Sequence, residues 1–364
     1  MSSSSKVAVV AAGGTGGHLF PAEAVSHVLI SRGWRVVLAT DSRGDQYAPQ
    51  FPAEERLSLE AATFRSGDPI GMLRASLRIS KGVSQARAAY ARLRPAVVVG
   101  FGGYPSLPAL LAARSRRIPT VIHEQNAVLG RVNRRLARSA AAVACAFPIL
   151  KRADSRVRKR LHVVGNPVRP DIAALHDRPY APPEQTVRLL VTGGSQGAKL
   201  LSELVPDAMR LVSEDLRVRL RVEQQTRVES IDFARRTFAE AGVECEIAPF
   251  FRNMSGRLGA AHIVVGRAGA STVSELAVAG LPSILIPLRI AMDDHQTYNA
   301  KLLTDAGAAL SLAEEGLTAE AFARTLEEMA SDPEGLMRRS AAARNASAPR
   351  AAEHLADLIE DVAR

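Results

Sequence analysis

The sequence of 364 residues has few cysteines, few aromatic residues and no long apolar run. Its two cysteines, Cys145 and Cys245, belong to no CxxC or Cys/His cluster, which argues against a disulfide framework or a structural zinc site. No apolar stretch approaches the roughly 20 residues that a membrane-spanning helix needs, and "MSSSSK" lacks the charged region of a signal peptide. We therefore expect a globular protein of a reducing cytoplasm.

Acidic residues are scarce in the first half of the chain. Residues 1–165 hold 25 lysines and arginines against 9 acidic residues, a net charge of +16, whereas the remainder carries −6. Such an asymmetry indicates a partner for the surface of the first half. Aromatic residues make up only 4%, which argues against single-stranded nucleic acid, whose unpaired bases stack on aromatic rings. We favour an anionic membrane surface, and ordinary solvated helix faces are the alternative.

Short apolar runs alternate with amphipathic segments along the whole chain. Continuous β-branched runs are typical of strands buried on both faces, and their alternation with helices indicates parallel sheets. Because the chain exceeds the roughly 250–300 residues of a single core, we predict an α/β protein with two Rossmann-like, doubly wound domains. The expected strands are 6–12, 35–40, 96–101, 120–125, 141–147, 188–194, 219–224, 245–250, 262–266 and 283–288, and the expected helices include 20–32, 105–116, 197–213 and 271–280.

A proline-rich segment separates the two halves. Five prolines fall between Pro167 and Pro183, and proline cannot donate to a strand ladder, so this segment is expected to be an extended linker. We place the boundary near residue 165, which gives domains 1–165 and 166–349. A last helix over 350–364 can pack back on the first domain.

Three glycine-rich loops follow apolar strands. The stretches "GGTGGHLFP" (13–21) and "GGSQGAK" (193–199) expose backbone N–H groups that suit a phosphate. Neither is a standard nicotinamide or ATP loop, because Leu19 occupies the third glycine position and Lys199 lacks the P-loop spacing. In the third loop, "GRAGASTVSE" (266–275), Thr272 and Glu275 have the spacing of a capping box. The alternative is that Glu275 accepts hydrogen bonds from the two hydroxyls of a ribose.

Two further polar clusters follow strands. "IHEQNAVLG" (122–130) has no histidine at 127, which excludes the zinc motif H-E-x-x-H. "DDHQTYNA" (293–300) offers imidazole and amide groups. Open α/β sheets bind ligands at the carboxyl ends of their strands, so together with the glycine loops these clusters predict one ligand cleft.

As a set, these motifs, with "GFGGYPSLP" (100–108) and "GNPVR" (165–169), resemble the MurG family of glycosyltransferases from about residue 7 to 310. The resemblance implies the GT-B architecture of two facing domains, with the acceptor in the first and the donor in the second. It implies transfer of N-acetylglucosamine from its UDP donor to the 4-hydroxyl of lipid I, which forms lipid II for peptidoglycan and cell-wall synthesis. The location that it implies is the cytoplasmic face of the cell membrane, as a peripheral protein.

The resemblance also implies the substrate-binding residues. Glu275 corresponds to the residue on the ribose hydroxyls, Phe251 to the contact with uracil, and Gln296 to a sugar contact. His295 stands where some relatives have a second glutamine, and the role of Tyr104 on the acceptor side is open. The full set is Thr15, Gly16, Gly17, Tyr104, Asn126, Arg169, Ser195, Phe251, Arg267, Ala270, Ser271, Thr272, Val273, Ser274, Glu275, His295, Gln296 and Asn299.

The implied inverting reaction needs a base for the acceptor hydroxyl and positive charge for the leaving diphosphate. His18 is our first candidate base, and Glu124 is the rival; each could instead be structural. No D-x-D sequence occurs, so we expect no cofactor and no essential metal, and we predict full activity in excess chelator. The charge of the leaving group then falls on helix N-termini and Arg169.

Membrane contact is expected from "MLRASLRISKG" (72–82), in which leucines alternate with basic residues as in an interfacial helix. An ordinary amphipathic helix covering the core is the alternative. Arginines at 131, 134, 135 and 138 predict one basic helix face. Two rival activities stay open at this point: an isomerase like UDP-N-acetylglucosamine 2-epimerase, and another GT-B transferase that acts on a lipid.

Overall fold

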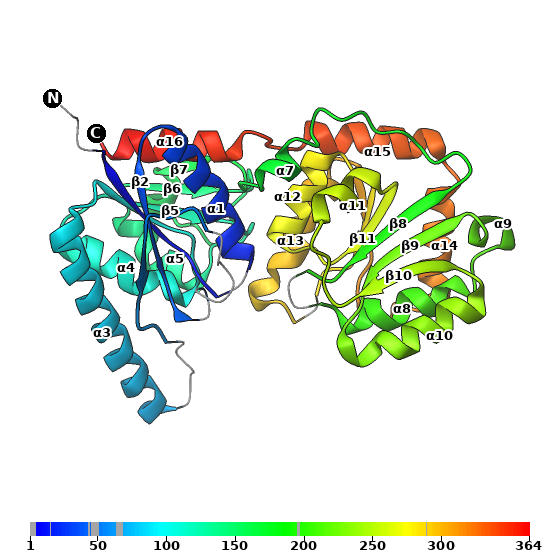
Figure 1. The fold of residues 1–364 in the computed structure, drawn as a ribbon, viewed down its shortest axis with the longest axis horizontal. Coiled ribbons are helices and arrows are strands. Elements are labelled where there is room, and N and C mark those ends of the chain that lie inside the picture. The colour runs from blue at the N-terminus through cyan, green and yellow to red at the C-terminus, as the bar shows by residue number, and fades with distance from the viewer. Residues whose placement is uncertain are drawn as a thin grey trace. The chain divides into compact units, whose positions relative to one another are not determined.

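The computed structural model describes residues 5–14, 16–42, 44, 51–62, 68–194, 197–288 and 290–364. The chain forms two compact units, of which the first holds residues 1–169 and 350–364 and the second residues 170–349 (Figure 1). Each unit contains one parallel sheet with helices around it, which confirms the predicted α/β class.

The first unit has a seven-stranded sheet in the order β3-β2-β1-β4-β5-β6-β7. Every neighbouring pair is parallel. The sequence did not predict the edge strands β3 and β7, which are short and partly exposed. The strands are β1 (Val7–Ala11), β2 (Arg35–Thr40), β3 (Glu55–Ser58), β4 (Val97–Gly100), β5 (Thr120–Glu124), β6 (Ala142–Cys145) and β7 (Leu161–Val163).

The second unit repeats the pattern with six parallel strands in the order β10-β9-β8-β11-β12-β13. Its strands are β8 (Val187–Thr192), β9 (Leu220–Gln225), β10 (Glu244–Ala248), β11 (Ile263–Gly266), β12 (Ser283–Leu285) and β13 (Ala309–Ser311). In both sheets the strand order reverses beside the first strand, at β1/β4 and at β8/β11. This is the point where doubly wound sheets bind ligands, and the glycine loops after β1 and β8 lie there.

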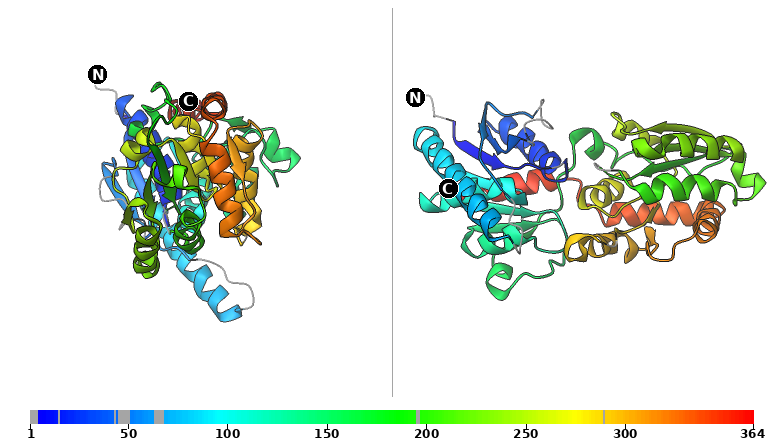
Figure 2. Two further views of the ribbon diagram at one scale, coloured as in Figure 1. Left: turned by 90° about the vertical axis from the view of Figure 1, so that its right-hand side faces the viewer. Right: turned by 90° about the horizontal axis from the view of Figure 1, so that it is seen from below.

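Helices cover both faces of the first sheet (Figure 2). The side chains of β1 alternate between two cores. Val9 packs into the core that includes residues of α3 and α4, and Val10 packs into the one that includes residues of α1 and α16. The helical segments of this unit are α1 (Gly16–Ser31), α3 (Pro69–Leu93), α4 (Gly103–Ser115), α5 (Arg131–Leu136), η1 (Ala137–Ser139), α6 (Ser155–Arg158) and α16 (Ala351–Val362).

The last helix, α16, belongs to the first unit. Arg32 at the end of α1 pairs with Asp357 at 2.7 Å and with Glu360 at 3.0 Å. The indole N–H of Trp34 also donates to Glu360, at 2.9 Å. Leu355 and Ile359 are fully buried against the α1 side of the sheet. Polar and apolar contacts therefore both fix this helix.

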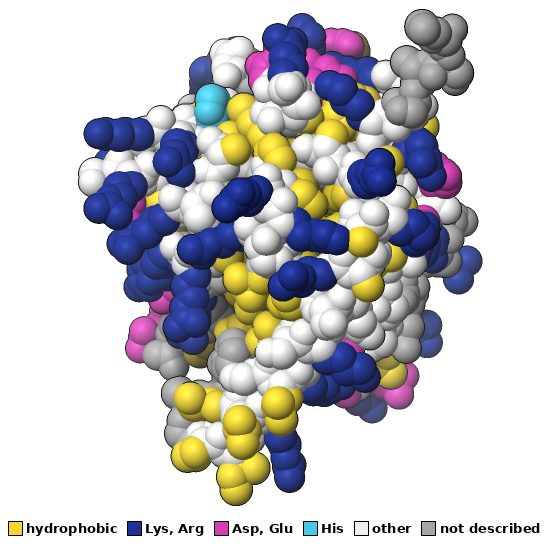
Figure 3. All heavy atoms as spheres, turned by 90° about the vertical axis from the view of Figure 1, so that its left-hand side faces the viewer, with side chains coloured by type: hydrophobic (Ala, Val, Ile, Leu, Met, Phe, Trp, Pro, Cys, Tyr) yellow, Lys and Arg dark blue, Asp and Glu magenta, His cyan; other side chains and the backbone are white. Residues whose placement is uncertain are grey.

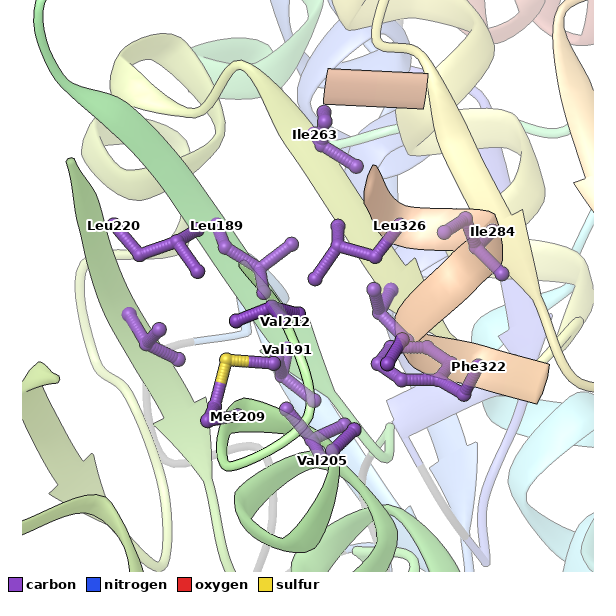
Figure 4. Close-up of a cluster of buried hydrophobic side chains, with 14 of the residues drawn as sticks. Leu189, Val191, Val205, Met209, Val212, Leu220, Ile263, Ile284, Phe322 and Leu326 are labelled. Atoms are coloured by element: carbon purple, nitrogen blue, oxygen red, sulfur yellow. The ribbon is translucent and has the colours of Figure 1, made fainter. Parts of the chain in front are cut away.

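The second unit is built around one large apolar core. Leu189 and Val191 of β8 meet Phe322 and Leu326 of α14 there, all essentially inaccessible to solvent (Figure 4). Truncation of a buried phenylalanine such as Phe322 costs about 3–5 kcal/mol. The helical segments are α7 (Pro170–Ala173), α8 (Lys199–Met209), α9 (Glu214–Arg217), η2 (Val228–Ser230), α10 (Ile231–Ala241), α11 (Met254–Ala260), α12 (Ala270–Ala279), η3 (Met292–Asp294), α13 (His295–Thr304), α14 (Ala319–Ala330) and α15 (Pro333–Asn345).

Candidate active site

The first glycine loop leads directly into α1. The helix begins at Gly16, so Gly16 and Gly17 are helical and His18 lies in the first turn; the predicted start at residue 20 was too late. Gly14 has φ of 89°, a conformation that glycine adopts without steric cost. Thr15 lies outside the described residues. The loop thus places an imidazole at the carboxyl end of β1.

His18 contacts loops from two other strands. Its Nδ1 lies 2.9 Å from Oε1 of Gln125, the residue after β5. On the other side, its ring lies against the turn after β4, because a Cβ added to Gly103 would stand 3.4 Å from His18 Nε2. Tyr104 follows in the first turn of α4 and is half-buried. Residues from the ends of β1, β4 and β5 therefore meet at His18.

Glu124, the rival candidate base, is only 2% exposed and is surrounded by donors. Its carboxylate accepts from the backbone and the side-chain amide of Asn126, at 3.1 and 3.3 Å. It also accepts from the backbone N–H of Gly130 at 2.9 Å and from the Asn133 side chain at 2.8 Å. Four donors occupy the acceptor directions of this carboxylate, an arrangement that favours a structural role for it.

Two buried asparagines near this end of the sheet were not among the predicted site residues. Asn133 is 2% exposed, and its Oδ1 has no hydrogen-bond partner among the described residues. A Cβ added to Gly102 would lie 3.1 Å from Asn133 Nδ2 and 3.6 Å from His18 Cε1, so both side chains lie against the same turn. Asn166, in "GNPVR", is 3% exposed and neither of its amide atoms has a partner in the described part of the chain.

Arg169 is half-buried at the end of the first unit. Its guanidinium carbon lies 5.0 Å from the centre of the Phe20 ring, a cation–π distance. Its Nε is buried and makes no hydrogen bond to any described residue. The side chain is thus held by an aromatic ring of α1 and retains donor capacity.

The second glycine loop is held by hydrogen bonds to a glutamine that was not among the predicted site residues. Gln225, at the end of β9, accepts from Thr192 Oγ1 at 3.0 Å and from the Gly193 N–H at 3.2 Å. Its amide nitrogen donates to the carbonyls of Gly194 and Pro249, at 3.0 and 3.2 Å. Ser195 lies outside the described residues. The only sequence signal for Gln225 was its place at the carboxyl end of a predicted strand.

The third loop leads into α12, and the capping-box reading of it was wrong. The N-cap is Gly269, whose φ of −64° and ψ of 146° are extended, and a glycine has no side chain with which to cap the helix. Thr272 is the third residue inside α12. The first N–H groups of a helix have no intrahelical partner, so this terminus suits an anion.

The remaining residues of the third loop lie in the first turns of α12. Ser271 Oγ is buried without a partner among the described residues. Glu275 is half-buried four residues further on, hence on the same side of the helix as Ser271. Thr272 is also half-buried, whereas Ala270, Val273 and Ser274 are buried.

Three other predicted residues hold loops in place. Arg267 is 8% exposed and donates to the Ile286 carbonyl at 3.1 Å and to Glu314 at 2.9 Å. Gln296 accepts from the Leu288 N–H at 2.9 Å. Asn299 is fully buried and donates to the Ala268 carbonyl at 3.1 Å. His295 begins α13 and is half-buried.

Little of the Phe251 side chain is accessible to solvent. It is 4% exposed and lies under Arg257, whose guanidinium carbon is 3.8 Å from the ring centre. Its neighbour Phe250 is 61% exposed. The aromatic ring that is accessible at this position is therefore that of Phe250, not that of Phe251.

Among the described residues, no group of three or more histidines, cysteines or acidic residues is placed to hold a metal ion. Both cysteines are free. Activity without a metal stays a prediction for experiment.

Comparison with known proteins gives a consistent result. Residues 8–145 match the glycosyltransferase family 28 N-terminal domain, and residues 188–355 match its C-terminal domain. The chain is 61% identical over 360 residues to the UDP-N-acetylglucosamine–N-acetylmuramyl-(pentapeptide) pyrophosphoryl-undecaprenol N-acetylglucosamine transferase of Caulobacter vibrioides, covering 99% of this chain and 100% of that one. The enzyme of the same name from Phenylobacterium zucineum is 60% identical, with 99% of each chain covered.

The fold is similar to that of a solved relative. The crystal structure of Acinetobacter baumannii MurG matches with a TM-score of 0.78 and 31% sequence identity, over 98% of this chain and 99% of that chain. This similarity confirms the GT-B class expected from the sequence.

Proposed function

Because the chain belongs to the MurG family of glycosyltransferases, we propose that it transfers N-acetylglucosamine from UDP-N-acetylglucosamine to lipid I and so forms lipid II. The observation that carries this proposal is the identity of 61% to a transferase of that name over nearly the whole of both chains. Such similarity favours the peptidoglycan enzyme over an isomerase or a different lipid glycosyltransferase.

We infer that the donor binds at the start of α12. The N-terminus of this helix, whose N-cap is a glycine, suits the negative charge of a diphosphate. Ser271 has a buried hydroxyl that lacks a partner among the described residues, and Glu275 can accept from both hydroxyls of a ribose. Arg267, Gln296 and Asn299 support this site by holding the surrounding loops. Arg169 is the proposed further source of positive charge.

For the chemical step, we propose His18 as the base. As the acceptor 4-hydroxyl attacks the anomeric carbon, its proton passes to His18 Nε2, the bond from that carbon to the diphosphate oxygen breaks, and UDP leaves from the opposite face. Nε2 has no hydrogen-bond partner among the described residues, whereas the Glu124 carboxylate is occupied by four donors. Glu124 is then a positioning residue for the loop that contains Asn126.

We propose that α3 brings the protein to the cytoplasmic face of the membrane. Ile70, Leu73 and Leu77 of this helix are 66%, 63% and 63% exposed. Figure 3 shows a group of hydrophobic side chains at the lower end of this face of the molecule. The other side of α3 packs on the core through residues such as Ile79 and Tyr90, so the helix also covers the core, as the alternative interpretation of the sequence predicted. No helix in the described part of the chain is both long and apolar enough to cross a bilayer.

The basic side chains near this apolar group differ in their availability. All three side chains are exposed, but Arg78 and Lys81 pair with Glu60 at 3.1 and 3.3 Å, whereas Arg74 makes no ion pair with a described residue. The prediction that four arginines lie on one face of an α-helix was wrong for Arg138, whereas Arg131, Arg134 and Arg135 do lie in α5. The α-helix ends at Leu136, and Arg138 lies in a 3-10 turn where it pairs with Asp154 at 2.7 Å.

The test is transfer of labelled N-acetylglucosamine from its UDP donor to a lipid I analogue by the purified protein. A product with the mobility and mass of lipid II is expected, also in excess chelator. Formation of free N-acetylmannosamine or its UDP derivative from the donor alone would instead support an epimerase. Transfer to diacylglycerol but not to the lipid I analogue would support the other lipid glycosyltransferases.

A further inference from the structure

A buried chain of hydrogen bonds runs from His18 to the backbone after β7. His18 Nδ1 lies 2.9 Å from Gln125 Oε1. The Gln125 amide nitrogen lies 3.0 Å from His123 Nδ1 and 3.1 Å from the His123 carbonyl oxygen. His123 Nε2 in turn lies 3.0 Å from the carbonyl oxygen of Gly165. Three side chains and two carbonyls thus form one continuous network.

Two backbone carbonyls fix the direction of every bond in this network, because a carbonyl oxygen can only accept. The His123 carbonyl requires the NH₂ end of Gln125 beside it, which places the Gln125 oxygen opposite His18. The Gly165 carbonyl requires a hydrogen on His123 Nε2, and His123 Nδ1 is then the acceptor for the Gln125 amide. Each assignment supports the other.

We propose that Gln125 and His123 are positioning residues that hold neutral His18 as its Nδ1–H tautomer, with the basic lone pair at Nε2. Since the Gln125 oxygen is an acceptor, His18 Nδ1 has to carry the hydrogen that it donates. The catalytic consequence rests on the proposed function, in which Nε2 receives the proton of the acceptor hydroxyl. The tautomer itself follows from the network alone.

Burial keeps the network in this state. His123 is fully buried and Gln125 is 2% exposed, so water does not compete for their hydrogen bonds. Burial lowers the pKa of His123 to about 4, which keeps its ring neutral near pH 7 and its Nδ1 available as an acceptor. The ring also packs against Phe101, with centroids 5.4 Å apart.

Two glycines lie next to the part of the His18 ring that faces away from Gln125. Gly102 and Gly103 have φ of 83° and 71°, and a Cβ at Gly103 would stand 3.3 Å from His18 Cδ2 and 3.4 Å from Nε2. A side chain there would cover the nitrogen that carries the lone pair. The turn after β4 therefore places no side chain of residue 102 or 103 against Nε2, while the network after β5 holds the hydrogen on Nδ1.

The direct test is the ¹⁵N spectrum of the histidine-labelled protein near pH 8, with the His18 signals assigned from a His18→Gln variant. The wild type is expected to show His18 as the Nδ1–H tautomer. In Gln125→Met, which keeps the side-chain length but removes the acceptor, that form should give way to the Nε2–H tautomer preferred by free imidazole. Gln125→Glu retains an oxygen opposite Nδ1 and should retain the Nδ1–H form.

The matched control is Gln224→Met, the same substitution at a buried glutamine of the second unit. It should leave the His18 spectrum unchanged. An Nε2–H tautomer in the wild type, or an Nδ1–H form that persists in Gln125→Met, would overturn the proposal.

Kinetics separate this proposal from the proposed function. Gln125→Met should lower kcat about 10²-fold, within the contribution of a positioned base, and leave the KM for the donor unchanged. If Gln125→Met switches the His18 tautomer but keeps the wild-type kcat, then His18 is not the base, although the hydrogen-bond network is as described. Absence of any transfer by the wild type would contradict the proposed function and leave the spectrum unaffected.

Discussion

The side-chain amide of Asn133 donates a 2.8 Å hydrogen bond to the buried carboxylate of Glu124. This bond joins α5 to the end of β5 and closes the loop that carries Gln125 and Asn126. Together with the Gly130 N–H at 2.9 Å, it shows why a carboxylate is needed here: the surrounding groups are donors.

Glu124→Gln should therefore destabilise the protein. The NH₂ of the new glutamine would face a donor and leave it unsatisfied, at a cost of about 2–3 kcal/mol. Urea unfolding measures the change. The control Glu184→Gln, at an exposed position, should alter the free energy of unfolding by less than about 0.5 kcal/mol. Equal stabilities of wild type and Glu124→Gln would contradict the structural role.

Glu275→Ala tests recognition of the ribose. Loss of a carboxylate that accepts from ribose hydroxyls should raise the KM for UDP-N-acetylglucosamine about 10–100-fold. The variant should also lose discrimination against a 2′-deoxyuridine donor, because the missing hydroxyl no longer matters. Glu334→Ala, at a side chain that is 90% exposed, is the control. Retained discrimination in Glu275→Ala would place the ribose elsewhere.

The stability of the protein should fall as the pH is lowered from about 6.5 to about 4. Burial is the main reason that the pKa of His123 is lowered from 6.5 to about 4 in the folded state. Over this range the unfolded chain binds a proton that the folded protein does not, so acid favours unfolding, by about 3 kcal/mol in total. Unfolding curves at several pH values measure how steeply the free energy of unfolding depends on pH.

In His123→Phe the free energy of unfolding should fall less steeply between pH 6.5 and pH 4 than in the wild type, whatever the stability of this variant at neutral pH. His27→Gln, at an exposed position of α1, should keep the wild-type slope. An unchanged slope in His123→Phe would show that His123 does not titrate in this way.

Membrane binding should depend on the exposed leucines of α3. Burial of a leucine side chain contributes about 1.5–3 kcal/mol, so Leu73→Ser with Leu77→Ser should weaken co-sedimentation with anionic vesicles at least about tenfold. Leu211→Ser, at a position 48% exposed in the second unit, serves as the control. Equal loss in the control would argue against a specific role for α3.

Charge reversal tests the electrostatic part of this contact. Arg74→Glu, Arg78→Glu and Lys81→Glu together should weaken binding to vesicles with anionic lipid more than binding to neutral vesicles. The difference should shrink at high salt, because ions screen exposed charges. Unchanged binding would reject this segment as the membrane contact.

The central strands could be predicted from sequence because runs such as "VAVVA" and "AVVVG" are apolar throughout, as strands buried on both faces must be. Three of the four edge strands, β3, β7 and β13, could not, whereas the fourth, β10, overlaps the predicted strand 245–250. "ERLS" of β3 has exposed charges, and β13 has only three residues. The start of α12 was misjudged because the backbone of Gly269 takes the cap position that a side chain at Thr272 was expected to fill.

Part of the candidate site was also accessible from sequence. Glycine loops and polar residues after strands indicate where a ligand binds, and they can be recognised without knowledge of the tertiary contacts. The network behind His18 was not accessible, because it depends on which distant side chains the sheet brings together. From sequence alone, Gln125 is only a polar residue in a loop. Its contact with His18 becomes apparent once β1 and β5 are placed in one sheet. The ion pair of Arg267 with Glu314 was likewise not accessible, because the two residues are 47 positions apart in the sequence.

The most direct test of the account is the single-turnover rate of N-acetylglucosamine transfer to the lipid I analogue by wild type, His18→Gln and His27→Gln. We expect His18→Gln to be slower by about 10²–10⁴-fold with unchanged donor affinity, and His27→Gln, on the same helix, to match the wild type. Transfer by His18→Gln at the wild-type rate would contradict the account.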